Sequence, residues 1–253
     1  MTASRRTRAS WNAGSDEYQS RHGERLRETA LAWGVWGIPE SELGVLGPLE
    51  GRDVLELGCG AAQWTLALRA ARVRAVGIDQ SERQLAHART AARSAPARAP
   101  LVQGNAERLP FRDACFDLVF CDHGAMTFAS PDFTVAEAAR VLRTGGLFAF
   151  CMSTPILDVC WDTAADRLGT TLRAPYFELS EHSDGESVVC QRPYGAWIRL
   201  FRRNALAIED LIELRPPPAA TTTYAEYAPL EWARSWPAEH IWKARKTRDG
   251  EPC

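Results

Sequence analysis

The chain has 253 residues, with 30 lysines and arginines against 32 aspartates and glutamates, and a formal net charge of −2 at pH 7. This length can bury a sizeable core in one large domain. The near-neutral charge offers no broad positive surface for a phosphate backbone, so we expect no nucleic-acid partner. No apolar run approaches the ~20 residues that cross a bilayer. Residues 1–10 also lack the apolar segment of a secretory signal, so we expect a cytoplasmic protein without membrane contact.

The seven cysteines are scattered along the chain, odd in number and without a C-x-x-C pair. This distribution argues against a disulfide framework and against a structural zinc site. Several of them lie in or beside apolar runs, where a reduced cysteine behaves as a small hydrophobic side chain. We therefore interpret them as buried thiols.

Residues 6–47 have apolar side chains spaced for one helical face, and Pro39 and Gly47–Pro48 interrupt them. We expect residues 1–50 to form a helical N-terminal extension or lid. From Arg52 the pattern changes to short apolar strands that alternate with helices, which predicts parallel strands joined by right-handed crossovers. The expected strands are 54–57, 73–79, 101–103, 115–121 and 147–152; the expected helices are 61–71, 81–94 and 132–142, with a turn at Thr144–Gly146.

The C-terminal third departs from this rhythm. Residues 153–192 form an insertion, residues 194–204 an amphipathic helix, and residues 208–215 a strand that ends before three prolines. A loop at 216–239 leads to a last strand at 240–246, and residues 247–253 are expected to be disordered. We interpret 51–246 as one domain whose insertion and loop form a cap.

Polar residues and glycines follow each of the first strands. Ligands of open doubly wound sheets bind beyond the carboxyl ends of the strands, so one small ligand is expected to touch all of these residues. They are Glu56 and Gly58–Gly60 after the first strand, Asp79 at the end of the second, Asn105, Ala106 and Glu107 after the third, and Asp122 and His123 after the fourth.

The spacing suits an adenosine ligand. Glycines at 58 and 60 allow a tight turn and close backbone approach, and the following helix points its free N–H groups at the ligand. Asp79, about twenty residues further on, is placed to accept hydrogen bonds from ribose hydroxyls. Gln63 replaces the third glycine of a dinucleotide fingerprint, and Glu56 would repel a pyrophosphate but favour a cationic ligand.

Four segments together resemble the motifs of class I S-adenosylmethionine-dependent methyltransferases of the small-molecule type. They are "VLELGCG", "VGIDQS", "GNAERLPFRDACFDLVFCDH" and "RVLRTGGLFAF", which follow one another in family order between Arg52 and Met152. The resemblance implies a Rossmann-like, doubly wound α/β sheet of seven strands, mostly parallel with the last strand antiparallel. It also implies S-adenosyl-L-methionine as the cofactor, S-adenosyl-L-homocysteine as its product, and a small organic acceptor as the partner, with oligomerisation possible.

The same resemblance implies roles for individual residues. The methionine end would lie against Glu56, Gly58, Cys59 and Gly60, the ribose against Asp79, and the adenine against Gln80, Asn105, Ala106 and Glu107. The backbone at Cys121 and Asp122 would line the sulfonium side, and Tyr18 or Arg21 would close over the amino-acid tail. The family often has aspartate where Asn105 stands. The end of the fifth strand lacks the Asp-Asn pair of the metal-assisted members, so no metal is expected.

His123 is the candidate general base, because imidazole titrates near neutral pH and the residue lies at the cleft edge. The alternative is that it only shapes the pocket. Several of the nine tryptophans lie outside the sheet-forming segments, which favours an aromatic-walled cavity for a small, partly apolar acceptor. Two other functions remain open: an NAD(P)-dependent oxidoreductase, and a nucleotide-binding protein without methyl transfer.

Overall fold

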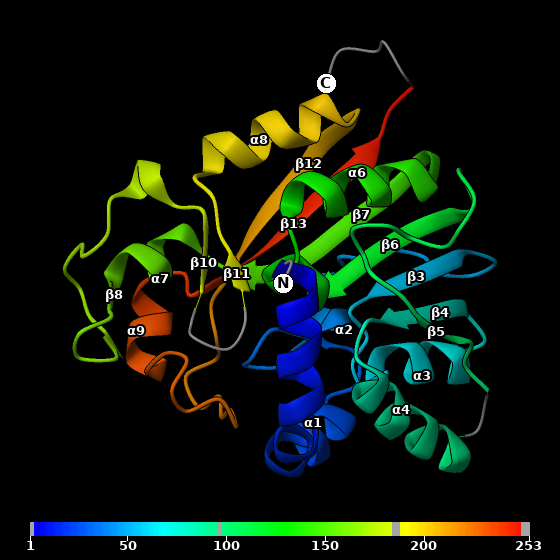
Figure 1. Cartoon of the computed structure of the whole chain (residues 1–253), viewed down its shortest axis with the longest axis horizontal. Helices are drawn as coiled ribbons and strands as arrows, with labels where there is room; N and C mark the ends of the chain where they lie inside the picture. The colour runs from blue at the N-terminus through cyan, green and yellow to red at the C-terminus, as the bar shows by residue number, and fades with distance from the viewer. Residues whose placement is uncertain (1–2, 96–97, 184–187, 249–253) are drawn as a thin grey trace.

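A seven-stranded sheet with helices on both faces forms the centre of the molecule in the computed structural model, which describes residues 3–95, 98–183 and 188–248 (Figure 1). The strand order is β12-β13-β7-β6-β3-β4-β5, and β13 alone runs antiparallel to the other six strands. The predicted fold class is thus confirmed. In sheet order the strands are β12 (Leu206–Leu214), β13 (Glu239–Lys246), β7 (Leu142–Ser153), β6 (Phe116–Asp122), β3 (Asp53–Leu57), β4 (Arg74–Asp79) and β5 (Leu101–Gln103).

Some helices cover the two faces of this sheet, whereas others pack together beyond the strand ends with the short hairpins (Figure 1). The helices are α1 (Ala3–Glu28), α2 (Glu40–Leu43), α3 (Gln63–Ala70), α4 (Glu82–Ser94), α5 (Gly124–Phe128), α6 (Pro131–Val141), α7 (Pro155–Cys160), α8 (Tyr194–Arg203) and α9 (Leu230–Ser235), with a short 3₁₀ turn at Tyr176–Glu178. The small strands pair as β1 (Ala32–Trp33) with β2 (Ile38–Pro39), β8 (Trp161–Asp162) with β9 (Arg167–Leu168), and β10 (Glu181–Ser183) with β11 (Val188–Cys190).

Alternation along β3 shows how the layers form. Leu55 and Leu57 pack on one face with α6 and α8, in the core that includes Trp197. Val54 packs on the opposite face in the core that includes Trp64 of α3. Successive side chains of a strand point to opposite faces, and both faces are covered here, which explains why the central strands are apolar almost throughout. These two cores hold the strand ends in fixed positions.

Two features of the core differ from the sequence-based prediction. The turn expected at Thr144–Gly146 is part of β7, which begins at Leu142 directly after α6. Gly145 takes a φ of +80° within a strand whose pairing to β6 shifts register. The left-handed backbone of this glycine therefore disturbs the pairing of the strand locally and does not reverse the chain. Helix α5, directly after His123, was not predicted because it is a single short turn.

The N-terminal extension is helical only in its first part. Helix α1 ends at Glu28, and the chain then forms the β1–β2 hairpin instead of the expected helix to residue 47. Gly34 and Gly37 have φ values of +71° and +64°, which the turn requires and a helix excludes. Trp33 is fully buried in this hairpin against the sheet.

One carboxylate holds this hairpin in place. Glu40 Oε2 accepts hydrogen bonds from Trp33 Nε1 at 2.6 Å and from the Val45 N–H at 3.2 Å, and its Oε1 accepts from the Leu46 N–H at 2.8 Å. Because a charged acceptor serves three donors, the network ties Trp33 of the hairpin to the backbone of Val45 and Leu46.

Most of the predicted tail, residues 249–253, lies outside the described residues. Within the described part of the chain, no helix combines the length and apolarity that crossing a membrane requires.

The Glu40 network provides a test of this anchoring. Glu40→Ala should lower the free energy of unfolding by about 2–4 kcal/mol, because three donors lose a charged acceptor. Glu42→Ala, an exposed change in the same short helix, should cost less than about 1 kcal/mol. Urea denaturation of both variants checks this, and equal losses would show that the network does not anchor the hairpin.

Candidate active site

A cavity of about 1080 Å³ lies at the carboxyl ends of β3, β4, β5 and β6. It exceeds the ~300–1,000 Å³ typical of a pocket for a single ligand, so it has room for two small molecules. Most of the predicted site residues line it: Tyr18, Glu56, Gly58, Cys59, Gly60, Asp79, Gln80, Asn105, Ala106, Asp122 and His123.

Three predicted residues do not line this cavity. The Arg21 guanidinium pairs with Glu226 Oε1 at 3.0 Å on the surface. Cys121 is fully buried in the sheet core, and its thiol donates to the His123 carbonyl. The Glu107 carboxylate accepts from the Ser130 N–H at 2.9 Å, so it holds a neighbouring loop.

Backbone packing gives a second reason for glycine at position 58, besides the expected approach of a ligand. A Cβ at Gly58 would lie 2.3 Å from the backbone nitrogen of Ala125, and a Cβ at Gly124 would lie 2.7 Å from the Gly58 carbonyl. The loops after β3 and β6 therefore touch backbone to backbone. A Cβ at Gly60 would make only an ordinary contact, 3.7 Å from Gln84 Oε1, but Gly60 has a φ of +53°, so conformation rather than crowding favours glycine there.

Glu56 points into the protein toward α3. Its Oε2 accepts the Thr65 N–H at 2.9 Å and also the Thr65 hydroxyl, so it caps the amino end of α3 from within. Glu56 is only 4 % exposed, and burial raises its pKa to about 8, opposed by the Thr65 bonds and assisted by the charges of Asp122 and Asp79. At neutral pH this side chain is therefore mostly protonated in the unliganded protein, and a cation beside it would favour the carboxylate.

Asp79 and Asn105 lie at the next two strand ends. Asp79 Oδ2 accepts the Gly60 N–H at 2.9 Å and Oδ1 accepts the Ser81 N–H at 2.7 Å, which leaves a lone pair on each oxygen for a ligand. Burial raises the Asp79 pKa. Asn105 is bound more fully than expected: its amide oxygen accepts the Glu107 N–H and its amide nitrogen donates to Ser4 of α1.

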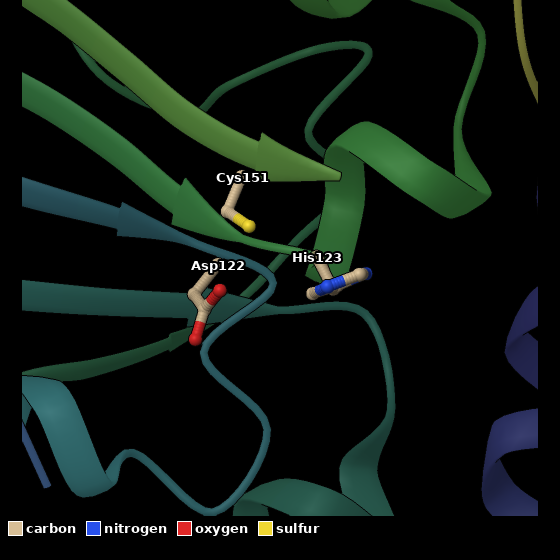
Figure 2. A group of neighbouring side chains, drawn as sticks. All are labelled: Asp122, His123 and Cys151. Carbon is tan, nitrogen blue, oxygen red and sulfur yellow. The ribbon is translucent and has the colours of Figure 1, made fainter. Parts of the chain in front are cut away.

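Three potential donor groups meet at the ends of β6 and β7. Asp122, His123 and Cys151 place ligand atoms within 4.8 Å of one another, and Figure 2 shows the His123 ring turned away from the Asp122 carboxylate. Hydrogen bonds already engage the first two: Asp122 accepts the Gly34 N–H at 3.0 Å, and His123 contacts Glu239. Burial raises the pKa of the Cys151 thiol. We assign no metal here.

His123 is held at the cavity wall by a residue that the sequence analysis missed. Its Nε2 lies 2.6 Å from Oε1 of Glu239, the first residue of β13. His123 has a φ of +57°, and backbone strain at a non-glycine residue often marks a functional position. No local pattern reveals this pair, because 116 positions separate the two residues in the sequence.

Helix α1 and the loop before α9 close the open side of the cavity. Tyr18 Oη lies 2.6 Å from Tyr224 Oη, and His22 stacks on Tyr224 with ring centroids 4.1 Å apart. Burial raises the pKa of Tyr18 to about 12, so this hydroxyl stays neutral. Trp11 and Trp161 line the cavity, as expected for an aromatic wall. Trp33 and Trp36 instead pack in the cores.

Comparison with known proteins shows which proteins this chain is similar to. Residues 55–150 match the family model described as a methyltransferase domain. The chain is 30% identical over 191 residues to the fatty-acid O-methyltransferase of Mycolicibacterium smegmatis, covering 73% of this chain and 62% of that protein. It is 38% identical over 116 residues to a demethylmenaquinone methyltransferase of Mycolicibacterium paratuberculosis, covering 46% of each. The chain thus spans between about half and three-fifths of the length of these relatives.

The fold agrees with solved structures. The S-adenosylmethionine-dependent methyltransferase from Mesorhizobium loti superposes with a TM-score of 0.66 at 23% identity, covering 84% of this chain and all of that one. This likeness supports the fold, and the matched model covers the strands that carry Glu56, Asp79 and Asp122. Through this domain, the chain belongs to the class I S-adenosylmethionine-dependent methyltransferases.

Proposed function

We propose that this protein transfers a methyl group from S-adenosylmethionine to a small organic acceptor. The observation that carries the proposal is the cluster of acids at the strand ends. Glu56 is buried and Asp122 is partly buried, and burial raises their pKa values to about 8 and about 6, although the charge of His123 partly opposes the shift at Asp122. Buried carboxylates are costly unless a positive charge accompanies them. A ligand with an ammonium and a sulfonium supplies that charge.

The residues fit the parts of this cofactor. Asp79 retains free lone pairs for the ribose hydroxyls, Glu56 lies where an ammonium would be stabilised, and Gln80 and Asn105 border the adenine region. Bound there, S-adenosylmethionine supplies an electrophilic methyl group. The chain's own contribution is to hold the acceptor in line and exclude water under α1 and Tyr224.

The charges argue against the dinucleotide alternative. Among the described residues that line the cavity, Arg173 is the only arginine or lysine, and it pairs with Asp162 at 3.2 Å. A pyrophosphate would find acids rather than cations along the wall.

The residues that line the rest of the cavity indicate the chemical class of the acceptor. Beyond His123 the cavity continues between the insertion and the loop at 216–239, with Leu157, Trp161 and Tyr227 as apolar or aromatic surface. Its ionisable lining there is Asp158, Asp162, Asp166, Glu178 and Arg173. We propose an acceptor that is neutral or cationic, with an apolar or aromatic body. These acids would repel the carboxylate of a fatty acid. We therefore propose a different acceptor class from that of the fatty-acid O-methyltransferase to which the chain is similar.

Calorimetry tests the cofactor assignment. S-adenosylhomocysteine should bind and NAD⁺ should not. At pH 7 the binding should release close to one proton, because the ligand's ammonium lowers the raised pKa of Glu56. Titrations in buffers of different ionisation enthalpy measure this release.

Glu56→Gln should abolish that proton release, whereas exposed Glu42→Gln should leave it unchanged. Binding of NAD⁺ without binding of S-adenosylhomocysteine would overturn the proposed function. Equal proton release in Glu56→Gln would show only that Glu56 is not the titrating group.

The acceptor class is testable with two matched probes. At pH 7.5, protein saturated with S-adenosylhomocysteine should bind phenethylamine at least about tenfold more tightly than 3-phenylpropionate, measured by ligand-observed NMR. The opposite charges of the probes explain the preference, which should fall as ionic strength rises. The double variant Asp166→Asn with Glu178→Gln should reduce it. Tighter binding of the carboxylate would contradict the assignment.

A further inference from the structure

Glu239 reaches the site through the topology of the sheet. Strand β13 runs antiparallel to its neighbours, so its first residue lies at the rim where the parallel strands end, opposite Ser153 of β7. His123 follows the last residue of β6 at the same rim. The 2.6 Å contact between Glu239 Oε1 and His123 Nε2 is therefore built by the central strands rather than by a mobile loop.

The Glu239 carboxylate is fixed on its other side by the β1–β2 hairpin. Its Oε1 also accepts the Val35 N–H at 2.8 Å. A Cβ at Gly34 would lie 2.6 Å from Oε1 and 2.8 Å from Oε2, so a side chain at this position would displace the Glu239 carboxylate. Glu239 is 1 % exposed, and its Oε2 has no hydrogen-bond partner among the described residues. A buried carboxylate held this tightly is costly unless it interacts with a charge.

The contact determines which ring nitrogen is free. An ionised carboxylate only accepts hydrogen bonds, so the proton of the neutral imidazole lies on Nε2 and is donated to Glu239. Nδ1 then has the lone pair. The ring remains 22 % exposed at the cavity wall, and the His123 N–H donates to the Cys151 carbonyl at 2.9 Å, which fixes the backbone that carries it.

We propose that Glu239 is a positioning residue for His123, holding its Nε2–H form so that Nδ1 takes the proton from an acceptor hydroxyl or amine. This inference rests on the proposed function. As His123 takes that proton, the acceptor's electron pair forms the bond to the methyl carbon, and the electrons of the broken carbon–sulfur bond stay on sulfur. One positive charge thus leaves the sulfonium and one appears on the imidazole, where Glu239 stabilises it.

The groups around His123 agree with this role. Burial lowers its pKa, but the hydrogen bond and charge of Glu239 and the charge of Asp122 outweigh it, so the pKa lies above the ordinary value near 6.5. The other neighbours are the Tyr227 ring at 5.9 Å, Cys151, and His240, whose own pKa is lowered to about 3 by burial. None of these supplies a second positive charge at neutral pH.

The test uses the full chain labelled with ¹⁵N-histidine, and His123→Asn assigns the signal. Spectra are recorded against pH without ligand and with S-adenosylhomocysteine. Without ligand, wild-type His123 should titrate above 6.5 and show the Nε2–H form when neutral. Glu239→Gln, which retains an oxygen acceptor, should lower the midpoint by about one unit, a tenfold loss in proton affinity. His22 and His87 should keep their midpoints.

Glu213→Gln is the matched control, because Glu213 is exposed and lies opposite His240 on β12. It should leave the His123 midpoint unchanged. An Nδ1–H form in the wild-type protein, or an unchanged midpoint in Glu239→Gln, would overturn the inference. Neither the midpoint nor the tautomer measurement needs turnover. The role of Glu239 can therefore be rejected while S-adenosylhomocysteine still binds. If the Glu239 effect is seen but S-adenosylhomocysteine does not bind, the proposed cofactor is rejected instead.

Discussion

Acids that outnumber the cations beside them are the constraint on which the site depends. Parallel strands bring Glu56, Asp79 and Asp122 to one rim, and the antiparallel strand adds Glu239. Their removal from water is nearly complete for Glu56 and Glu239 and partial for Asp79 and Asp122. This removal is unfavourable, and the described lining provides only Arg173 and the His123 ring in return. Hydrogen bonds that the carboxylates accept from backbone N–H groups offset part of this cost; the donors are Thr65, Gly60, Gly34 and Val35. The rest creates a preference for a positively charged ligand.

The N-terminal segment completes the site in two ways. Its hairpin supplies successive backbone N–H groups, from Gly34 to Asp122 and from Val35 to Glu239. Its helix α1 closes the cavity, but it contacts α4 and the strand ends mainly through polar groups, as in the contact of Asn12 with Ser81. Helices held by hydrogen bonds rather than apolar burial open at lower cost. This is a suitable property for a segment that covers a ligand.

Local sequence was enough to predict the sheet and most of the rim. Alternating apolar segments defined the strands, and Ser81 marked the start of α4, where its side chain caps the Gln84 N–H. The hairpin at 32–39 was missed because its glycines lie within apolar residues spaced like a helix. Glu239 was missed because only the sheet brings it to His123, and no spacing rule relates positions so far apart. The close contact of Gly58 with Ala125 was missed for the same reason.

A crystal structure with bound S-adenosylhomocysteine would show whether the acids at the rim receive the positive charge of the ligand. We expect the ligand's ammonium beside Glu56, both ribose hydroxyls on Asp79, and the sulfur on the side of the cavity that His123 faces. A ligand bound with its amino-acid end away from Glu56, or outside the cavity at the ends of β3 to β6, would contradict this expectation.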